Sequence, residues 1–151
     1  MARFRLVTFV PAPRERVFDL ARDLDFHQRS LAHTGERIVG GRNGGLIELG
    51  EEVEWEARHF GLRLRLRVRI TEMDRPNAFV DTQVRGPFVS MTHRHEFRDA
   101  PGGTEMIDAW THRAPLGALV DPILSRYMER LLRTRNAALV AALSESPTRP
   151  D

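Results

Sequence analysis

The sequence predicts an α+β fold: a sheet of antiparallel strands, a short helix region after the first strand, and one long helix at the C-terminus. Two observations lead to this prediction. Apolar and polar residues alternate strictly through residues 51–73, a pattern typical of half-buried strands. Apolar residues at helical spacing then recur through residues 123–143. With 151 residues the chain has room for one ordinary domain, which we expect over residues 1–144, followed by a disordered tail over residues 145–151.

The first third of the chain predicts a strand, a helix and a glycine-rich region. Residues 3–10 alternate well enough for a strand, and the following Pro-Ala-Pro ends it. A helix is expected from Pro13, which suits the first helical position. Its apolar side consists of Val17, Phe18, Ala21 and Leu24. Six glycines in residues 34–50 indicate short strands or bulges joined by tight turns.

The strictly alternating segment predicts a β-hairpin with its turn at Phe60 and Gly61, and a two-residue or a four-residue loop gives the same register. The expected inner pairs are Val53–Val68, Trp55–Leu66 and Ala57–Leu64, and the outer pairs are Glu52–Arg69, Glu54–Arg67 and Glu56–Arg65. The second strand carries the arginines Arg63, Arg65, Arg67 and Arg69. These arginines could form a phosphate-binding stripe, but three of the four face a glutamate. We therefore favour a solvated face that neutralises itself.

Three further strands and the long helix complete the predicted fold. The strands cover residues 78–84, 88–99 and 104–114, and the segments DRPN, RGP and APGG that precede them mark turns. Asp121 can cap the long helix, and Pro122 can occupy its first helical position. The apolar stripe consists of Ile123, Leu124, Tyr127, Met128, Leu131, Leu132, Ala138, Leu139, Ala142 and Leu143. The charged residues expected mostly outside the stripe are Arg126, Glu129, Arg130, Arg133 and Arg135.

The composition excludes several classes of protein. The chain has no cysteine, so a disulfide framework, a thiolate zinc site and a cysteine nucleophile are excluded. All 23 basic residues are arginine, which excludes a Schiff-base lysine and a Walker lysine. A net charge of +2 gives little support to nucleic-acid binding. With no apolar run of membrane-spanning length and no signal peptide, we expect a cytoplasmic protein without stable membrane insertion.

The chain carries the stretch VPAPRERVFDLARDLD near its start and the stretches RGPFVSMTHRHEF and GGTEMIDAWTHRAPLG further on. With these stretches and this order of elements it resembles the START-like (SRPBCC) superfamily, in its polyketide cyclase/dehydrase and lipid-transport-like branch, and the pattern is familiar from bacterial members. The resemblance covers essentially the whole chain. It implies a helix-grip fold, in which a curved antiparallel sheet wraps around the C-terminal helix and encloses a hydrophobic cavity. The fold alone does not fix the activity, because lipid carriers, receptors and cyclases share it.

Two histidines, His93 and His95, are expected on the inward face of the strand over residues 88–99. A four-residue loop over residues 100–103 sets the register with the next strand. The expected inner pairs are Phe97–Met106, His95–Asp108, His93–Trp110 and Met91–His112, and Arg98–Glu105 is the expected outer pair. Directly opposed residues have Cβ atoms about 4.5–5.5 Å apart, so His95 and Asp108 can form a hydrogen bond.

This polar cluster has three interpretations. It can be structural, with His95 and Asp108 satisfying each other. It can form the polar end of a pocket for a hydrophobic or amphipathic small molecule, lipid- or polyketide-like. It can also supply an acid and a base, with His95 and Asp108 as candidates, to a cofactor-free cyclase or dehydratase of lyase type. The candidate ligand-binding residues are His93, His95, Asp108, Trp110, His112, Trp55, Met91 and Tyr127. The binding interpretation is our prediction, and the enzyme is the alternative.

Several features stay open at this point. The His-x-His pair with Asp108 and His112 could supply metal ligands, but the spacing does not require a metal, so we expect neither a metal nor another cofactor. We expect His27, His33 and His59 in exposed loops or turns, where they can rim an entrance. The side on which Asp81 and Gln83 lie depends on the turn that follows them. An interaction module without a ligand would follow if large side chains filled the cavity, and exposed edge strands allow a homodimer.

Overall fold

The computed structural model describes residues 1–144, and its seven strands form one antiparallel sheet in the order β1-β7-β6-β5-β4-β3-β2. The strands are β1 (Ala2–Val10), β2 (Arg37–Gly41), β3 (Glu52–His59), β4 (Leu62–Asp74), β5 (Ala78–Arg85), β6 (Ser90–Ala100) and β7 (Gly103–Arg113). The helices are α1 (Arg14–Ala21), α2 (Leu24–Ser30), η1 (Ala32–Thr34), η2 (Gly117–Leu119) and α3 (Asp121–Ser144). This order confirms the predicted helix-grip fold. The tail predicted over residues 145–151 lies outside the described residues.

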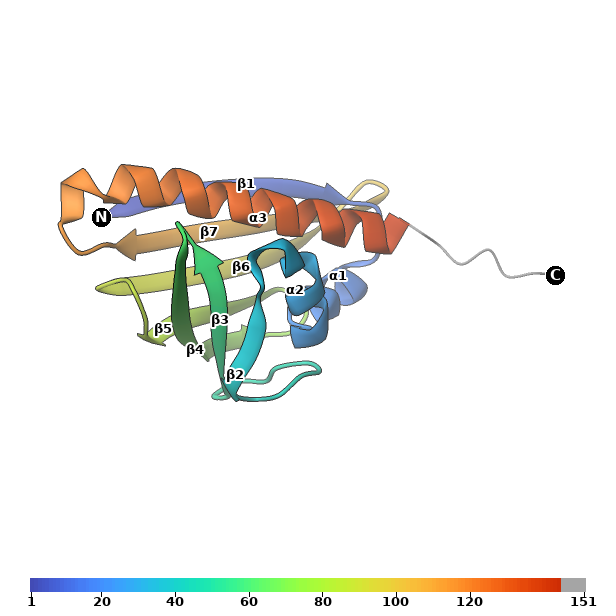
Figure 1. Cartoon of the computed structure of the whole chain (residues 1–151). Coiled ribbons are helices and arrows are strands. Elements are labelled where there is room, and N and C mark those ends of the chain that lie inside the picture. The colour runs from blue at the N-terminus through green and yellow to red at the C-terminus, as the bar shows by residue number, and fades with distance from the viewer. Residues whose placement is uncertain (145–151) are drawn as a thin grey trace.

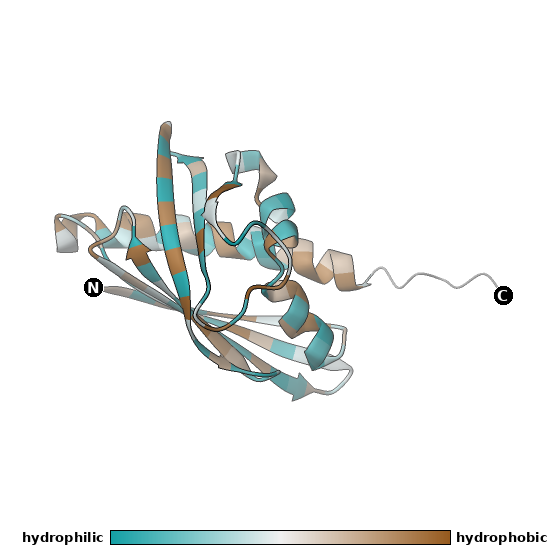
Figure 2. Cartoon of the chain, turned by 90° about the horizontal axis from the view of Figure 1, so that it is seen from below, coloured by the Kyte–Doolittle hydropathy of each residue, from teal (hydrophilic) through white to brown (hydrophobic). Residues whose placement is uncertain are grey.

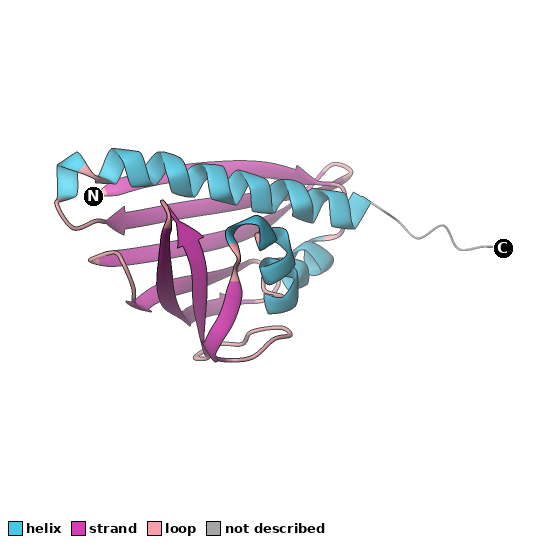
Figure 3. Ribbon diagram, viewed as in Figure 1, coloured by secondary structure: helices cyan, strands magenta, loops and turns pink. Residues whose placement is uncertain are grey.

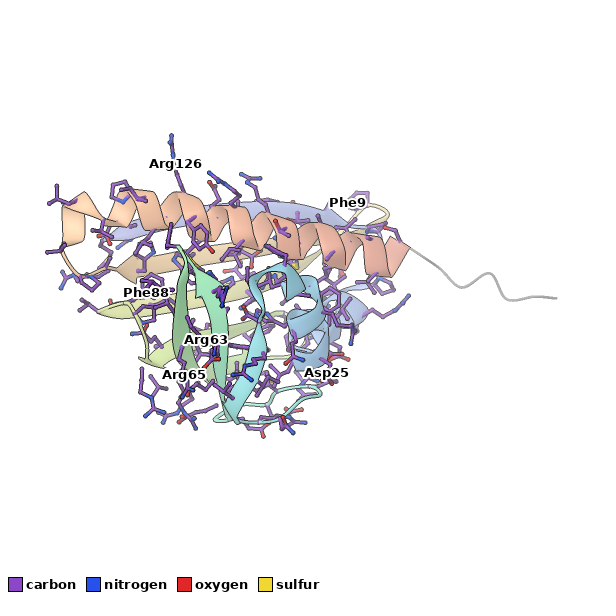
Figure 4. All side chains as sticks on the ribbon, viewed as in Figure 1. Phe9, Asp25, Arg63, Arg65, Phe88 and Arg126 are labelled. Carbon is purple, nitrogen blue, oxygen red and sulfur yellow. The ribbon has the colours of Figure 1, made fainter. Side chains whose placement is uncertain are left out.

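Helix α3 lies along β1 and β7, and the sheet curves so that the tip of the β3–β4 hairpin comes back towards the helix (Figure 1, Figure 3). At this tip the ring centroids of Phe60 and Tyr127 are 4.5 Å apart. Arg126 projects from α3 away from the sheet (Figure 4). On the other side of the fold, Phe18 of α1 packs edge to face against Phe97, at 5.3 Å between centroids. No helix within residues 1–144 is long and apolar enough to cross a membrane.

The β3–β4 hairpin has the predicted register. All six predicted pairs are cross-strand partners, from Glu52–Arg69 to Ala57–Leu64. The turn has two residues, Phe60 and Gly61, with φ values of 54° and 73°, so both adopt the left-handed conformation that suits a tight hairpin turn. Figure 2 shows the alternation as successive teal and brown bands along the strands. Alternation alone is sufficient to predict this register, because one face of the hairpin is apolar throughout and the other is charged.

The helix region after β1 differs from the prediction. Instead of one helix from Pro13 to Leu24, the chain forms α1 and α2 with a break at Arg22 and Asp23, and Pro13 precedes the first helix as its N-cap. The Asp23 carboxylate accepts hydrogen bonds from the backbone N–H groups of Asp25 and Phe26, at 2.9 and 3.1 Å, and so caps α2. The sequence contained this signal, since aspartate is among the preferred N-cap residues.

The glycine-rich region forms one strand, β2, whose register with β3 shifts between Ile38 and Gly40, in agreement with the predicted bulge. Its IVG segment lies in β2, whereas the LIEL segment over residues 46–49 is a loop. Arg22 holds this loop: its Nη1 donates to the carbonyl oxygen of Ile47 at 3.0 Å and to Glu48 at 2.9 Å. A loop fixed by a side chain 25 residues earlier in the chain leaves no periodic pattern in the sequence.

Helix α3 confirms the predicted apolar stripe in part. Leu131, Leu132, Leu139 and Leu143 are buried, whereas Ile123 is exposed. Arg135, which was expected on the polar side, is buried, because its charge is paired inside the fold.

Asp121 does not cap the helix with its side chain, although the sequence predicted that it would. Its Oδ1 accepts from the backbone N–H of Ala114 at 2.7 Å and so ties α3 to the end of β7.

Candidate functional site

A cavity of about 310 Å³ is lined by the concave face of the sheet, α2 and α3. Most of its wall is apolar, and the residues that form it include Trp55, Ile70, Met91, Trp110, Tyr127 and Leu132. Some lining residues reach solvent: Phe60 at the tip of the β3–β4 hairpin is 59% exposed, Pro87 in the β5–β6 loop is exposed, and Leu124 of α3 is half-buried. The cavity therefore opens between these three segments.

A group of six residues lies at and directly behind the polar end of the cavity, and we call it the inner cluster. Its members are Asp81 of β5, His93 and His95 of β6, Asp108 of β7, and Arg135 and Asn136 of α3. All but Asp81 are buried. Phe88 of the β5–β6 loop, labelled in Figure 4, also lines the cavity.

Asp108 is the centre of the inner cluster. Its Oδ1 accepts hydrogen bonds from His93 Nε2 and Arg135 Nη2, both at 2.7 Å, and its Oδ2 accepts from Asn136 Nδ2 at 2.8 Å. Burial alone would raise the pKa of Asp108, but the Arg135 charge and the hydrogen bond from His93 outweigh it and hold this pKa well below its usual range. Asp108 is therefore ionised, and it neutralises Arg135 inside the fold.

His95 does not form the predicted hydrogen bond with Asp108. The two residues are direct cross-strand partners as expected, but Nδ1 of His95 is 3.6 Å from Asp108, while Nε2 hydrogen-bonds Asp81 at 2.7 Å. Asp108 instead accepts from His93, Arg135 and Asn136, and each of the two histidines binds a diagonal neighbour on the adjacent strand. Asp81, whose side of the sheet the sequence left open, faces inward, and its pKa is raised by burial.

Both histidines of the inner cluster are neutral at physiological pH. Burial, followed by the neighbouring His95, lowers the pKa of His93 to about 4. Burial, followed by the Arg135 charge, lowers the pKa of His95 to about 3. The two rings stack at 3.7 Å between centroids. A neutral His93 that donates its Nε2 proton to ionised Asp108 keeps Nδ1 as an acceptor.

Six of the eight predicted ligand-binding residues line the cavity: Trp55, Met91, His93, His95, Trp110 and Tyr127. Asp108 lies behind this lining. His112 also lies behind it, where its Nδ1 accepts a hydrogen bond from the Trp110 indole N–H at 2.7 Å. His112 therefore orients Trp110, and burial lowers the pKa of its imidazole.

The cavity lining also includes His27, His59, Asp81 and Arg135, which were not among the predicted candidates. The His27 ring packs against Trp55 at 4.3 Å between centroids, and His59 Nδ1 pairs with the Tyr127 hydroxyl at 2.5 Å. Both histidines therefore belong to the cavity wall, while His33 is exposed as expected. Arg135 could have been found from its position between Leu132 and Leu139, at helical spacing on the buried side of α3.

Gln83, the other residue left open, does not line the cavity. Its side-chain amide accepts from the Phe88 backbone N–H at 3.2 Å and donates to the Phe88 carbonyl oxygen at 2.8 Å. It therefore closes the β5–β6 loop and holds Phe88 against the cavity.

The fold and the cavity together define a helix-grip protein, in which a curved antiparallel sheet encloses an internal pocket against a long helix. The chain belongs to the family described as polyketide cyclase/dehydrase and lipid transport, whose model matches residues 1–144. This membership confirms the resemblance to the START-like superfamily that the sequence suggested. No curated protein matches the chain in sequence.

Solved structures with the same fold come from several organisms. The protein TTHA0849 of Thermus thermophilus has a TM-score of 0.73 at 22% identity, covering 93% of this chain and 99% of that one. The Zhui aromatase/cyclase of Streptomyces sp. R1128 has a TM-score of 0.71 at 15% identity, covering 95% and 93%. The major latex-like protein 151 of Panax ginseng has a TM-score of 0.67 at 17% identity, covering 94% and 97%. These similarities establish the fold.

Proposed function

We propose that the protein binds a hydrophobic or amphipathic small molecule, lipid- or polyketide-like, in the cavity between the sheet and α3. The observation that carries this proposal is the cavity itself: about 310 Å³ with a mainly apolar wall and a polar cluster at one end. Pockets for small molecules generally combine these features, since apolar walls supply affinity and a few polar groups fix orientation. An interaction module with a filled interior fits this cavity poorly.

The polar end favours a ligand with a hydroxyl or carbonyl group. Among the hydrogen bonds of residues 1–144, none involves Nδ1 of His93 or Nη1 of Arg135, and both side chains line the cavity. Neutral His93 offers an acceptor and Arg135 offers a donor. A hydroxyl group can satisfy both, and a carbonyl oxygen can accept from Arg135. A free carboxylate is less well matched, because the charge of Arg135 is already paired with Asp108.

Native mass spectrometry of the purified protein, followed by solvent extraction, tests this proposal. We expect a small molecule bound to the wild type and also to Arg126→Met, a control at the arginine of α3 that projects away from the sheet. Leu124→Trp, at the half-buried mouth of the cavity, should reduce the occupancy at least tenfold while the thermal unfolding midpoint stays close to that of the wild type. Equal occupancy in Leu124→Trp and the control would overturn the proposal.

A cofactor-free cyclase or dehydratase is the second candidate, because the His93–Asp108 pair has the arrangement of an oriented base. The low pKa of His93, about 4, makes its imidazole a weak base at neutral pH, which favours binding over catalysis. Incubation with a poly-β-keto thioester separates the two candidates. Loss of water from the substrate, abolished by His93→Gln, would support the enzyme, whereas binding without conversion would support the carrier.

The remaining expectations stay predictions from the sequence: a cytoplasmic location, no nucleic-acid partner, and edge strands that allow a homodimer. Size-exclusion chromatography with light scattering would test the last of these directly.

A further inference from the structure

We infer that Asp81, His93 and His95 form a binding site for a divalent transition-metal ion, such as Zn²⁺, that opens into the ligand cavity. This site goes beyond the proposed function, because binding of an apolar ligand does not require it. The inference rests on three features of the inner cluster: the convergence of the three side chains, a carboxylate behind the imidazoles, and a buried nitrogen without a partner.

The three side chains converge from two adjacent strands. His93 and His95 share one face of β6, and Asp81 of β5 is the direct cross-strand partner of His93. One candidate ligand atom from each residue lies within 4.8 Å of the other two. Atoms that bind one ion at about 2.1 Å lie about 3.0–3.4 Å apart, so shifts of about an ångström close the site. All three residues line the cavity, so further coordination positions would face the bound small molecule.

Asp108 stands behind both imidazoles. It accepts from Nε2 of His93 at 2.7 Å and lies 3.6 Å from Nδ1 of His95. Histidines that bind metals commonly give their other ring N–H to a carboxylate, which fixes the tautomer and the ring orientation. Asp108, itself held by Arg135 and Asn136, would do this for both rings. Nδ1 of His93 and Nε2 of His95 are then the nitrogens left for the ion.

His95 supplies the second independent observation. Its Nδ1 is one of four buried side-chain nitrogen or oxygen atoms of residues 1–144 without a hydrogen-bond partner. An unpaired buried polar atom is costly. If an ion took the place between Nε2 of His95 and Asp81, which now bond each other at 2.7 Å, the ring proton would move from Nε2 to Nδ1, and a small rotation of the ring would bring Nδ1–H onto Asp108.

The charges of the inner cluster are compatible with a cation. Arg135 brings a fixed positive charge into the inner cluster, and Asp108 neutralises it. Within residues 1–144, Asp81 pairs only with neutral His95, so its carboxylate can compensate the ion. Two imidazoles and one carboxylate form a nitrogen-rich set that suits Zn²⁺, Fe²⁺ or Co²⁺ better than Mg²⁺ or Ca²⁺, which prefer oxygen ligands.

Metal titration of tag-free, chelator-treated protein tests the inference. We expect Zn²⁺ to bind with one ion per chain in calorimetry, and Co²⁺ to give visible d–d absorption that Zn²⁺ abolishes. Asp81→Asn and His95→Ala should weaken Zn²⁺ binding at least tenfold. The matched control is His33→Ala, since His33 is exposed and does not line the cavity.

Nitrogen-15 NMR of the imidazoles in the wild type keeps the test decisive even if a variant fails to fold. Zn²⁺ should shift the ring signals of His93 and His95 and leave that of His33 unchanged. Weak binding that shifts His33 as much as the others, or no binding at all, would overturn the metal site. Small-molecule occupancy measured with and without chelator separates this outcome from failure of the proposed function, because the cavity can retain its ligand without the ion.

Discussion

Two clusters of charged residues lie on opposite faces of the same sheet, and they differ in their access to water. The inner cluster surrounds Asp108 at the polar end of the cavity. The outer cluster covers the β3–β4 hairpin and consists of Glu52, Glu54 and Glu56 with Arg37, Arg63, Arg65, Arg67, Arg69 and Arg85. In the outer cluster arginine side chains lie over the carboxylates and reach solvent: Arg65 is 63% exposed in its side chain. In the inner cluster Arg135 is buried.

This difference decides what happens when a partner is lost. An outer arginine without its glutamate can turn towards water, so each pair contributes little by itself. Arg135 has no such alternative, because removal of Asp108 leaves a buried charge unpaired. Removal of one residue from the outer cluster should therefore cost little stability. Removal of one charged residue from the inner cluster should cost much more, because its partner stays buried.

The largest expected effect is the loss of Asp108. Asp108→Ala should lower the free energy of unfolding by about 3–5 kcal/mol, because the Arg135 guanidinium stays buried without a counter-charge. Urea unfolding followed by circular dichroism measures this change. The double variant Asp108→Leu with Arg135→Met should recover most of the loss, since it removes both charges together. A double variant as unstable as Asp108→Ala would contradict the charge-pairing argument.

The next effect is the dependence of stability on pH. Unfolded histidines bind a proton below about pH 6.5, while the folded pKa values of His93 and His95 are about 4 and about 3. Between pH 6.5 and 4 the unfolded chain therefore binds more protons, so stability is complete above pH 6.5 and falls as the pH is lowered. Each histidine contributes at most about 1.4 kcal/mol per pH unit. Asp81, whose pKa is raised, opposes this trend in part.

This pH dependence separates the two clusters. Hydrogen bonds from Arg37 and Arg65 lower the pKa of Glu56. The stability that the outer cluster contributes is therefore lost only when the pH falls below the usual pKa of a glutamate, about 4.3. A loss between pH 6.5 and 5 therefore reports on the buried histidines. His93→Gln should reduce the slope in this interval. Imidazole NMR signals of His93 that titrate near pH 6.5 in the folded protein would show that the inner cluster is accessible to water.

A smaller effect is expected at Glu56 in the outer cluster. Its carboxylate accepts from Arg37 Nη2 at 2.7 Å and from Arg65 Nε at 2.8 Å. Glu56→Gln should lower the melting temperature much less than Asp108→Ala, because both arginines can hydrate. The difference from wild type should shrink in 1 M salt, where the screening length is about 3 Å. A decrease in melting temperature that does not depend on salt would show that Glu56 behaves like a residue of the inner cluster.

The two clusters also differ in how far the sequence predicts them. The outer pairs follow from strict alternation within one continuous hairpin, and every predicted pair is present. The sequence predicted the β6–β7 register equally well, including His95 opposite Asp108. The prediction failed where a contact depends on a strand or helix outside the hairpin concerned. Asp81 faces inward because of the β5–β6 register, and Arg135 reaches Asp108 because of the rotation of α3. The register has no local pattern, and helical spacing places Arg135 on the buried side of α3 without showing which residue of the sheet it meets.

The smallest expected effect is at Arg63, and it tests the nature of the outer cluster itself. Arg63 lies opposite Arg58 and is 3.7 Å from Glu56, whereas its neighbour Arg65 donates to the same carboxylate at 2.8 Å. Arg63→Thr should therefore leave the melting temperature unchanged or raise it slightly, since it removes a like-charge pair and introduces a good strand former. Arg65→Thr is the matched variant and should lower it. Equal changes in both variants would mean that strand propensity, and not charge pairing, determines the stability of this face. In that case the match between glutamates and arginines would no longer argue against a phosphate-binding stripe.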